Sequence, residues 1–216
     1  MAKNTEREVV IPAGEIRLQG IFGLPSEKIG AIAFAHGTGS GRLSPRNNYV
    51  ARLLQDAGFA TLLFDLLEEP EELERRKVFD IELLAGRLLA GLHWLQNAPG
   101  TRGLKLGFFG ASTGAAAALQ AAAREPDGVS AIVSRGGRPD LAMDYLGKVK
   151  APTLLIVGGK DSPVIAMNEE AFKSLRGVKE LAIVPGATHL FEEPGALAKV
   201  AKLAADWFLK YMRPKK

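Results

Sequence analysis

Cysteine is absent from the 216 residues of this chain. The protein therefore has no disulfide bond, no thiolate metal site and no cysteine nucleophile. It also lacks any apolar run close to the ~18 residues that a membrane-spanning helix needs. The first eight residues are polar and charged, with no apolar signal segment behind them, so we expect a protein of the reducing cytoplasm.

A strong excess of charge of either sign is also missing. Lysine and arginine number 28 against 24 aspartate and glutamate residues. No basic block contains interleaved aromatic residues, so we expect no nucleic-acid partner and no membrane partner. With 47% hydrophobic and 24% charged residues, the composition is typical of a soluble globular protein, and the length fits one domain over residues 1–216.

Short β-branched runs alternate along the chain with longer Ala/Leu-rich stretches. The runs predict strands at residues 8–12, 15–23, 30–36, 59–65, 104–110, 129–134, 152–159 and 180–186. Helical patterns occupy residues 45–57, 78–97, 113–124, 163–175 and about 194–211, a short helix ends near 146, and 66–77 form a loop or short helix. This order predicts an α/β fold: a mostly parallel sheet of about eight strands, an antiparallel N-terminal edge and helices on both faces.

The segment Gly110-Ala111-Ser112-Thr113-Gly114 is a G-x-S-x-G pattern between a predicted strand and an Ala-rich predicted helix. In that context the pattern predicts a nucleophile elbow, a sharp strained turn that lifts a serine hydroxyl above the sheet. Side chains at positions 110 and 114 would collide with neighbouring backbone, which explains the two glycines. Alternatively, Ser112 only caps the helix.

A serine nucleophile of this type is followed in the chain by an acid and then by a histidine. Of the three histidines, His36 and His93 precede Ser112, which leaves His189, in a loop between the last predicted strand and helix. The alternative is a surface-loop histidine without a catalytic role.

Asp161 directly follows the strand predicted at 152–159, where an acid would meet the histidine. Asp140 and Asp144, one strand earlier, are rivals for this role. Asp161 could also be a turn residue or helix cap before Pro163. The sequence thus predicts a triad of Ser112, Asp161 and His189.

Acyl transfer also needs two N–H groups that stabilise the negative carbonyl oxygen. We expect one from Thr113, the residue after the nucleophile. The other should come from the glycine-rich loop after residues 30–36, which we call the oxyanion loop. Thr38, or alternatively Gly39, would donate it. His36 would shape this loop without transferring protons.

Four segments, HGTGSG (36–41), GASTGA (110–115), GGKD (158–161) and GATHLF (186–191), together resemble the α/β-hydrolase superfamily. The chain is most similar to a bacterial group named after dienelactone hydrolases, some of which are fused to phosphoribosyltransferase domains. The resemblance covers nearly the whole chain and implies an α/β-hydrolase fold, with this sequence as the hydrolase part. Dienelactone hydrolases proper usually carry cysteine where Ser112 stands, so the serine implies ordinary esterase chemistry.

Three arginines follow predicted strands or the oxyanion loop: Arg46, Arg135 and Arg138. They could hold a substrate carboxylate or phosphate, or form structural ion pairs with neighbours such as Asp140. The connection 135–151 is too short for a large lid, which favours small soluble esters.

The expected function is therefore a carboxylesterase-type serine hydrolase that needs no cofactor and no metal. Its partner would be a small, uncharged or anionic ester, and a homodimer is compatible with the sequence. The alternatives are acyl transfer or perhydrolysis at the same triad, or a non-catalytic accessory module.

Overall fold

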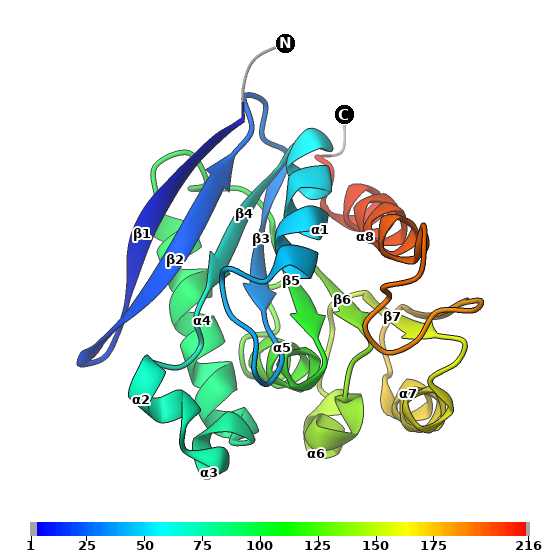
Figure 1. Cartoon of the computed structure of the whole chain (residues 1–216). Helices are drawn as coiled ribbons and strands as arrows, with labels where there is room; N and C mark the ends of the chain where they lie inside the picture. Colours follow the sequence, from blue (N-terminus) through cyan, green and yellow to red (C-terminus); the bar gives the residue numbers. More distant parts are fainter. Residues whose placement is uncertain (1–3, 215–216) are drawn as a thin grey trace.

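The computed structural model describes residues 4–214, which form one eight-stranded sheet flanked by helices (Figure 1). The strands are β1 (Thr5–Ala13), β2 (Ile16–Leu24), β3 (Gly30–Ala35), β4 (Phe59–Phe64), β5 (Leu106–Ala111), β6 (Ala131–Arg135), β7 (Thr153–Gly158) and β8 (Lys179–Val184). The longer helices are α1 (Pro45–Asp56), α4 (Ile81–Asn97), α5 (Thr113–Arg124), α7 (Ser162–Ser174) and α8 (Ala196–Met212). Short helical turns are α2 (Glu69–Glu72), α3 (Arg75–Val78), the 3-10 turn η1 (Pro139–Ala142) and α6 (Met143–Leu146).

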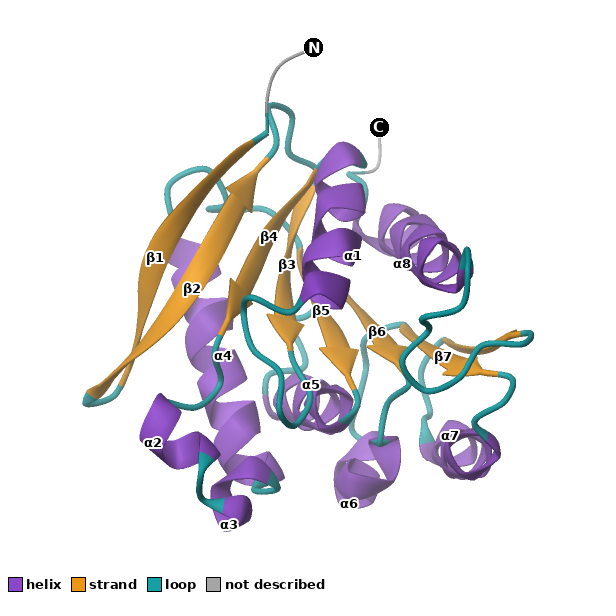
Figure 2. Cartoon of the chain, in the orientation of Figure 1, coloured by secondary structure: helices purple, strands orange, loops and turns teal. Residues whose placement is uncertain are grey.

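The strands lie in the order β1-β2-β4-β3-β5-β6-β7-β8. Neighbouring strands from β4 to β8 pair in parallel, whereas β1 pairs with β2 and β2 with β4 in antiparallel fashion (Figure 2). The expected parallel sheet with an antiparallel N-terminal edge is confirmed. The order also places β5, which leads to Ser112, in the middle of the sheet with β3 on one side and β6 on the other.

Burial explains why the central strands read as continuous apolar runs. Every residue of β3, β4, β5 and β7 is buried, because helices cover both faces of the sheet there. The edge strand β1 is exposed along most of its length, and β8, at the other edge, is mostly half-buried or exposed. Functional residues lie most often on the loops that connect the strands at the ends of such a sheet.

Helices α1 and α8 pack on one face, and α4, α5 and α7 pack on the other (Figure 1). The face under α5 is built from alanines: residues 115–118 are all fully buried. Their small side chains let α5 approach the sheet closely, which fixes the position of its first turn directly after Ser112.

Local capping sets several boundaries. Ser44 accepts a hydrogen bond from the backbone N–H of Asn47 and precedes Pro45, so α1 begins where the sequence predicts. Helix α4 begins at Ile81, later than the predicted residue 78, because the Asp80 side chain accepts the backbone N–H of Leu83 at 2.9 Å.

The connections confirm the expectation of no large lid. The predicted loop or short helix at 66–77 contains the two one-turn helices α2 and α3. The connection from β6 to β7 contains the short turns η1 and α6. Between residues 4 and 214, no helix combines the length and apolarity that crossing a bilayer requires.

Candidate active site

Ser112 stands at the sharp turn between β5 and α5, in a backbone conformation that side chains rarely adopt. Its φ is 52° and its ψ −123°. Such a conformation costs about 1–3 kcal/mol and persists only where the surrounding structure holds it. Here the Ser112 N–H donates to the carbonyl of Arg135 at 3.2 Å, and the Ser112 carbonyl accepts the N–H of Arg138 at 3.0 Å. The strained turn is therefore tied to the loop that follows β6.

Three glycines make room for this turn. A Cβ atom on Gly114 would lie 2.2 Å from the carbonyl oxygen of Ala35, and one on Gly110 would lie 2.5 Å from the Cα of Ala115. A Cβ on Gly37 would lie 2.8 Å from the Cβ of Ser112. The steric interpretation of Gly110 and Gly114 is confirmed, and Gly37 shows that the loop after β3 passes against the serine.

Asp161 and His189 are in direct contact. The Nδ1 atom of His189 lies 2.7 Å from Oδ2 of Asp161. Asp161 occupies the position before α7, but its side chain makes no capping bond to the helix. The carboxylate side chain is 13% exposed and the imidazole 38% exposed, so the histidine faces solvent while the acid behind it is largely shielded.

The turn after β6 connects this pair to the serine. The backbone N–H of Arg138 donates to the Ser112 carbonyl. A Cβ atom on Gly136, in the same turn, would lie 3.5 Å from Cε1 of His189. Asn168 of α7 steadies the turn by donating to the carbonyl of Gly137 at 3.0 Å. Ser112 and His189 thus both lie against the turn that follows β6, and Asp161 contacts His189.

The loop after β3 is fastened to the first residue of α5. The backbone N–H of Thr38 donates to Oγ1 of Thr113 at 3.1 Å, and the two threonine hydroxyls lie 3.2 Å apart. The N–H of Thr113 begins α5 and so has no acceptor within the helix. The two predicted donors, the backbone N–H groups of Thr38 and Thr113, therefore belong to residues in direct contact. The Thr38 N–H is already bonded to Oγ1 of Thr113, so it could donate to another oxygen only by sharing or breaking that hydrogen bond.

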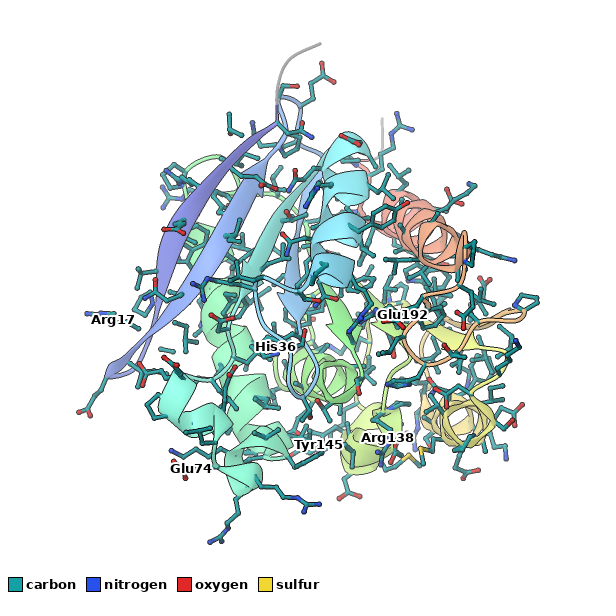
Figure 3. All side chains as sticks on the ribbon, in the orientation of Figure 1. Arg17, His36, Glu74, Arg138, Tyr145 and Glu192 are labelled. Atoms are coloured by element: carbon teal, nitrogen blue, oxygen red, sulfur yellow. The ribbon has the colours of Figure 1, made fainter. Side chains whose placement is uncertain are left out.

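His36 shapes this loop, as expected. Its Nε2 accepts the backbone N–H of Leu66 at 2.9 Å, so Nδ1 carries the proton and donates to the carbonyl of Gly37 at 3.0 Å. Burial lowers the pKa of His36 below its ordinary value of 6.5. The ring is therefore neutral and links the ends of β3 and β4 (Figure 3).

Asp65 is an anchor that sequence reasoning missed. Its Oδ1 accepts the backbone N–H of Arg42 at 2.7 Å, and its carboxylate also pairs with the Arg42 guanidinium. An aspartate directly after the buried strand β4 was the available signal. Together with His36, this pair holds both ends of the glycine-rich loop after β3 to the end of β4.

The three arginines are engaged differently. Arg138 forms a two-pronged ion pair with Asp140, with contacts of 2.9 and 2.7 Å, and Arg46 pairs with Glu192 at 3.0 Å. Figure 3 labels Arg138 and Glu192. Arg135 is 8% exposed, and its Nη2 lies 3.4 Å from Oδ1 of Asn47.

Arg135 is buried, whereas Arg46 and Arg138 are partly exposed. Its Nε and Nη1 atoms are shielded from solvent and have no hydrogen-bond partner among the described residues. Burial, reinforced by the charge of Arg46, lowers the pKa of Arg135 from its usual range to about 10, so the side chain remains charged at neutral pH. The ion pairs of Arg46 and Arg138 favour the structural alternative for these two arginines, whereas Arg135 forms no ion pair among the described residues.

The arrangement also separates Asp161 from its rivals. Asp140 is paired with Arg138, and Asp144 lies in the short helix α6.

Across residues 4–214, no group of three or more histidine, aspartate or glutamate side chains is arranged to hold a metal ion.

Comparison with known sequences gives a family. The sequence profile of the Dienelactone hydrolase family matches residues 44–213. A Mycobacterium tuberculosis protein named as a phosphoribosyl transferase is 56% identical over 207 residues. The match covers 96% of this chain but 47% of that protein, so the chain spans about half the length of the curated relatives it matches.

Comparison with solved structures gives the same fold. A dienelactone hydrolase from Anabaena variabilis is 56% identical, with a TM-score of 0.94 over 97% of this chain and 99% of that one. Est1E from Butyrivibrio proteoclasticus is 17% identical, with a TM-score of 0.81 over 94% of this chain and 98% of that chain. The expected α/β-hydrolase fold is confirmed.

Proposed function

Because this chain belongs to the dienelactone hydrolase family, we propose that it is a serine hydrolase that cleaves small soluble esters through an acyl-enzyme on Ser112. Two observations carry the proposal: the Asp161–His189 contact of 2.7 Å, and a serine held at φ 52° at the end of β5. A largely shielded carboxylate on Nδ1 leaves Nε2 of the imidazole to act as a base, and a strained elbow presents the hydroxyl.

The proposed reaction has two halves. In the first, Oγ of Ser112 attacks the ester carbonyl while Nε2 of His189 takes the hydroxyl proton and then gives it to the departing alcohol. In the second, His189 takes a proton from water, and the resulting hydroxide equivalent attacks the acyl-enzyme. The free acid leaves, and the proton returns to the serine oxygen.

Asp161 keeps the imidazole in the tautomer that carries its proton on Nδ1, and it stabilises the imidazolium formed in each half. The negative carbonyl oxygen would be received by the N–H of Thr113 and by that of Thr38, with Gly39 as the alternative. Serine in place of the usual cysteine of dienelactone hydrolases supports esterase chemistry over the lactone reaction of the family's name.

The transferase name of the mycobacterial relative does not contradict this proposal. This chain corresponds to 47% of that protein. We assign the transferase of the name to the other part of the relative, and the hydrolase to the part that this chain matches.

The test is hydrolysis of p-nitrophenyl acetate and butyrate by the wild type and by Ser112→Ala. The proposal expects wild-type turnover and a loss on the order of 10⁴-fold in kcat for the variant. Circular dichroism should show the same fold in both proteins. Equal activity of the two proteins would refute the serine mechanism.

A further inference from the structure

A cavity of about 270 Å³ opens beside the oxyanion loop. Residues 36–40 and Thr113 line it, so a substrate whose carbonyl oxygen meets the N–H groups of Thr38 and Thr113 would bring one of its two substituents next to this cavity. Leu67, Val78 and Leu84 contribute apolar side chains to its lining.

The chemistry of the lining selects a neutral group. Leu67 and Leu84 are 5% and 3% exposed, and they make the floor apolar. Among the described residues that line the cavity, Glu72 is the acidic one, and its side chain is exposed to solvent. His36 is buried, and its Nε2 accepts the N–H of Leu66, so the ring is neutral. A carboxylate or phosphate entering the cavity would lose water without gaining a cation.

The sheet order decides which substituent enters. The cavity is lined by the loops after β3 and β4 and by α2 to α4, on one side of β5. Asp161 and His189 follow β7 and β8, on the other side of β5. Figure 3 shows the same separation: His36 and Glu74 lie on the β4 side, and Arg138 and Glu192 lie toward β7.

His189 must protonate the leaving alcohol, so the alcohol belongs on the β6–β8 side of Ser112. The acyl chain then extends the opposite way. Resting on the proposed serine hydrolase function, we propose that this cavity is an acyl pocket for neutral, apolar acyl groups of medium length.

The volume sets the length. A water molecule takes up roughly 30 Å³ of liquid, so 270 Å³ displaces about nine waters, or an acyl chain of about six to eight carbons of similar bulk. Leu73 also lines the cavity but is 87% exposed, which places it at the mouth. An acyl chain in the pocket would cover this otherwise solvent-facing side chain.

The first test keeps the leaving group constant, with p-nitrophenyl esters from acetyl to dodecanoyl. The pocket predicts a rise in kcat/KM of about fourfold per methylene up to hexanoyl or octanoyl, and a fall for longer chains. An acyl chain ending in a carboxylate should react at least about tenfold more slowly than a neutral chain of equal length. A series that is flat or falls from acetyl onward would overturn the pocket while leaving the serine mechanism standing.

The second test fills the cavity with a larger side chain. Val78→Phe places a larger side chain in the cavity from a half-buried position and should lower the hexanoyl-to-acetyl ratio of kcat/KM at least about tenfold. The matched control is Val178→Phe, at a valine that is 54% exposed outside the cavity, and it should keep the wild-type ratio. If Val78→Phe instead acts on acetate esters of lengthening alcohols, the cavity holds the alcohol and the assignment is wrong.

A third measurement does not depend on turnover. In Ser112→Ala, hexanamide should raise the Tm more than acetamide does, and adding Val78→Phe should remove the difference. Equal shifts from the two amides would contradict an apolar pocket, whatever the esterase assay shows.

Discussion

Asp161 Oδ2 and His189 Nδ1 lie 2.7 Å apart, although the residues are 28 positions apart in the sequence. The carboxylate makes no capping bond to α7, so its contact with the imidazole is its one side-chain hydrogen bond among the described residues. An amide at position 161 would favour the wrong imidazole tautomer.

Asp161→Asn should therefore lower kcat for p-nitrophenyl butyrate about a thousandfold or more, with little change in fold. Asp140→Asn is the matched control, since Asp140 pairs with Arg138 at 2.7 Å instead. It should keep kcat within about threefold of the wild type, because a partly exposed ion pair contributes about 1 kcal/mol or less. Similar losses in both variants would show that Asp161 has no special role.

Gly114→Ala should destabilise the protein, because its new Cβ would stand 2.2 Å from a backbone oxygen that cannot move freely. We expect a loss of about 3 kcal/mol or more in the free energy of unfolding, which lowers Tm by about 6–12 °C. Differential scanning calorimetry measures this directly.

The control for that substitution is Gly86→Ala. Gly86 lies inside α4, and a Cβ there would meet nothing within 4 Å. Alanine stabilises a helix interior by about 0.5–1 kcal/mol relative to glycine, so Tm should rise slightly. A Gly114→Ala protein as stable as Gly86→Ala would contradict the tight passage of β3 beneath the elbow.

His36 should make stability depend on pH. Its pKa is lowered in the folded protein by burial, so below about pH 6.5 the unfolded chain binds a proton that the folded chain does not. The stabilisation is complete above pH 6.5 and is lost as the pH falls toward the folded pKa, by at most about 1.4 kcal/mol per pH unit.

Urea unfolding at pH 7.5, 6.5 and 5.5 measures the free energy of unfolding. His36→Gln should flatten the fall between pH 6.5 and 5.5, whereas His93→Gln, at an exposed histidine, should keep it. A wild-type stability that rises on acidification over this range would show that His36 is not a buried neutral ring.

Arg46→Gln and Arg138→Gln should not change the preference between acidic and neutral esters. Both guanidinium groups already pair with carboxylates, those of Glu192 and Asp140. The ratio of kcat/KM for the two ester types should stay within about threefold of the wild type, whereas loss of a charged hydrogen bond to substrate would change it about tenfold or more. A change of that size would assign the residue to substrate binding.

Much of this architecture was predictable from local patterns. The continuous apolar runs predicted the buried strands, and Ser44 with Pro45 predicted the start of α1. The G-x-S-x-G spacing predicted the tight elbow, since the collisions that forbid side chains at 110 and 114 arise within a few residues or from the adjacent strand.

Other features could not be read from the sequence because they depend on partners distant in the chain. The Thr38–Thr113 and Arg42–Asp65 contacts join segments whose register only the folded sheet defines. The same holds for Arg135, whose position after β6 predicted a place near the site but not its burial against α1. Side-chain direction at a strand end alternates with each residue, so one position decides between solvent and core.

The most direct measurement is covalent labelling with a fluorophosphonate probe, followed by intact-mass and peptide mass spectrometry. The serine mechanism predicts one adduct, located on Ser112, absent from Ser112→Ala and formed far more slowly in His189→Ala. An unlabelled Ser112 in the folded wild-type protein, or a label on another residue, would contradict it.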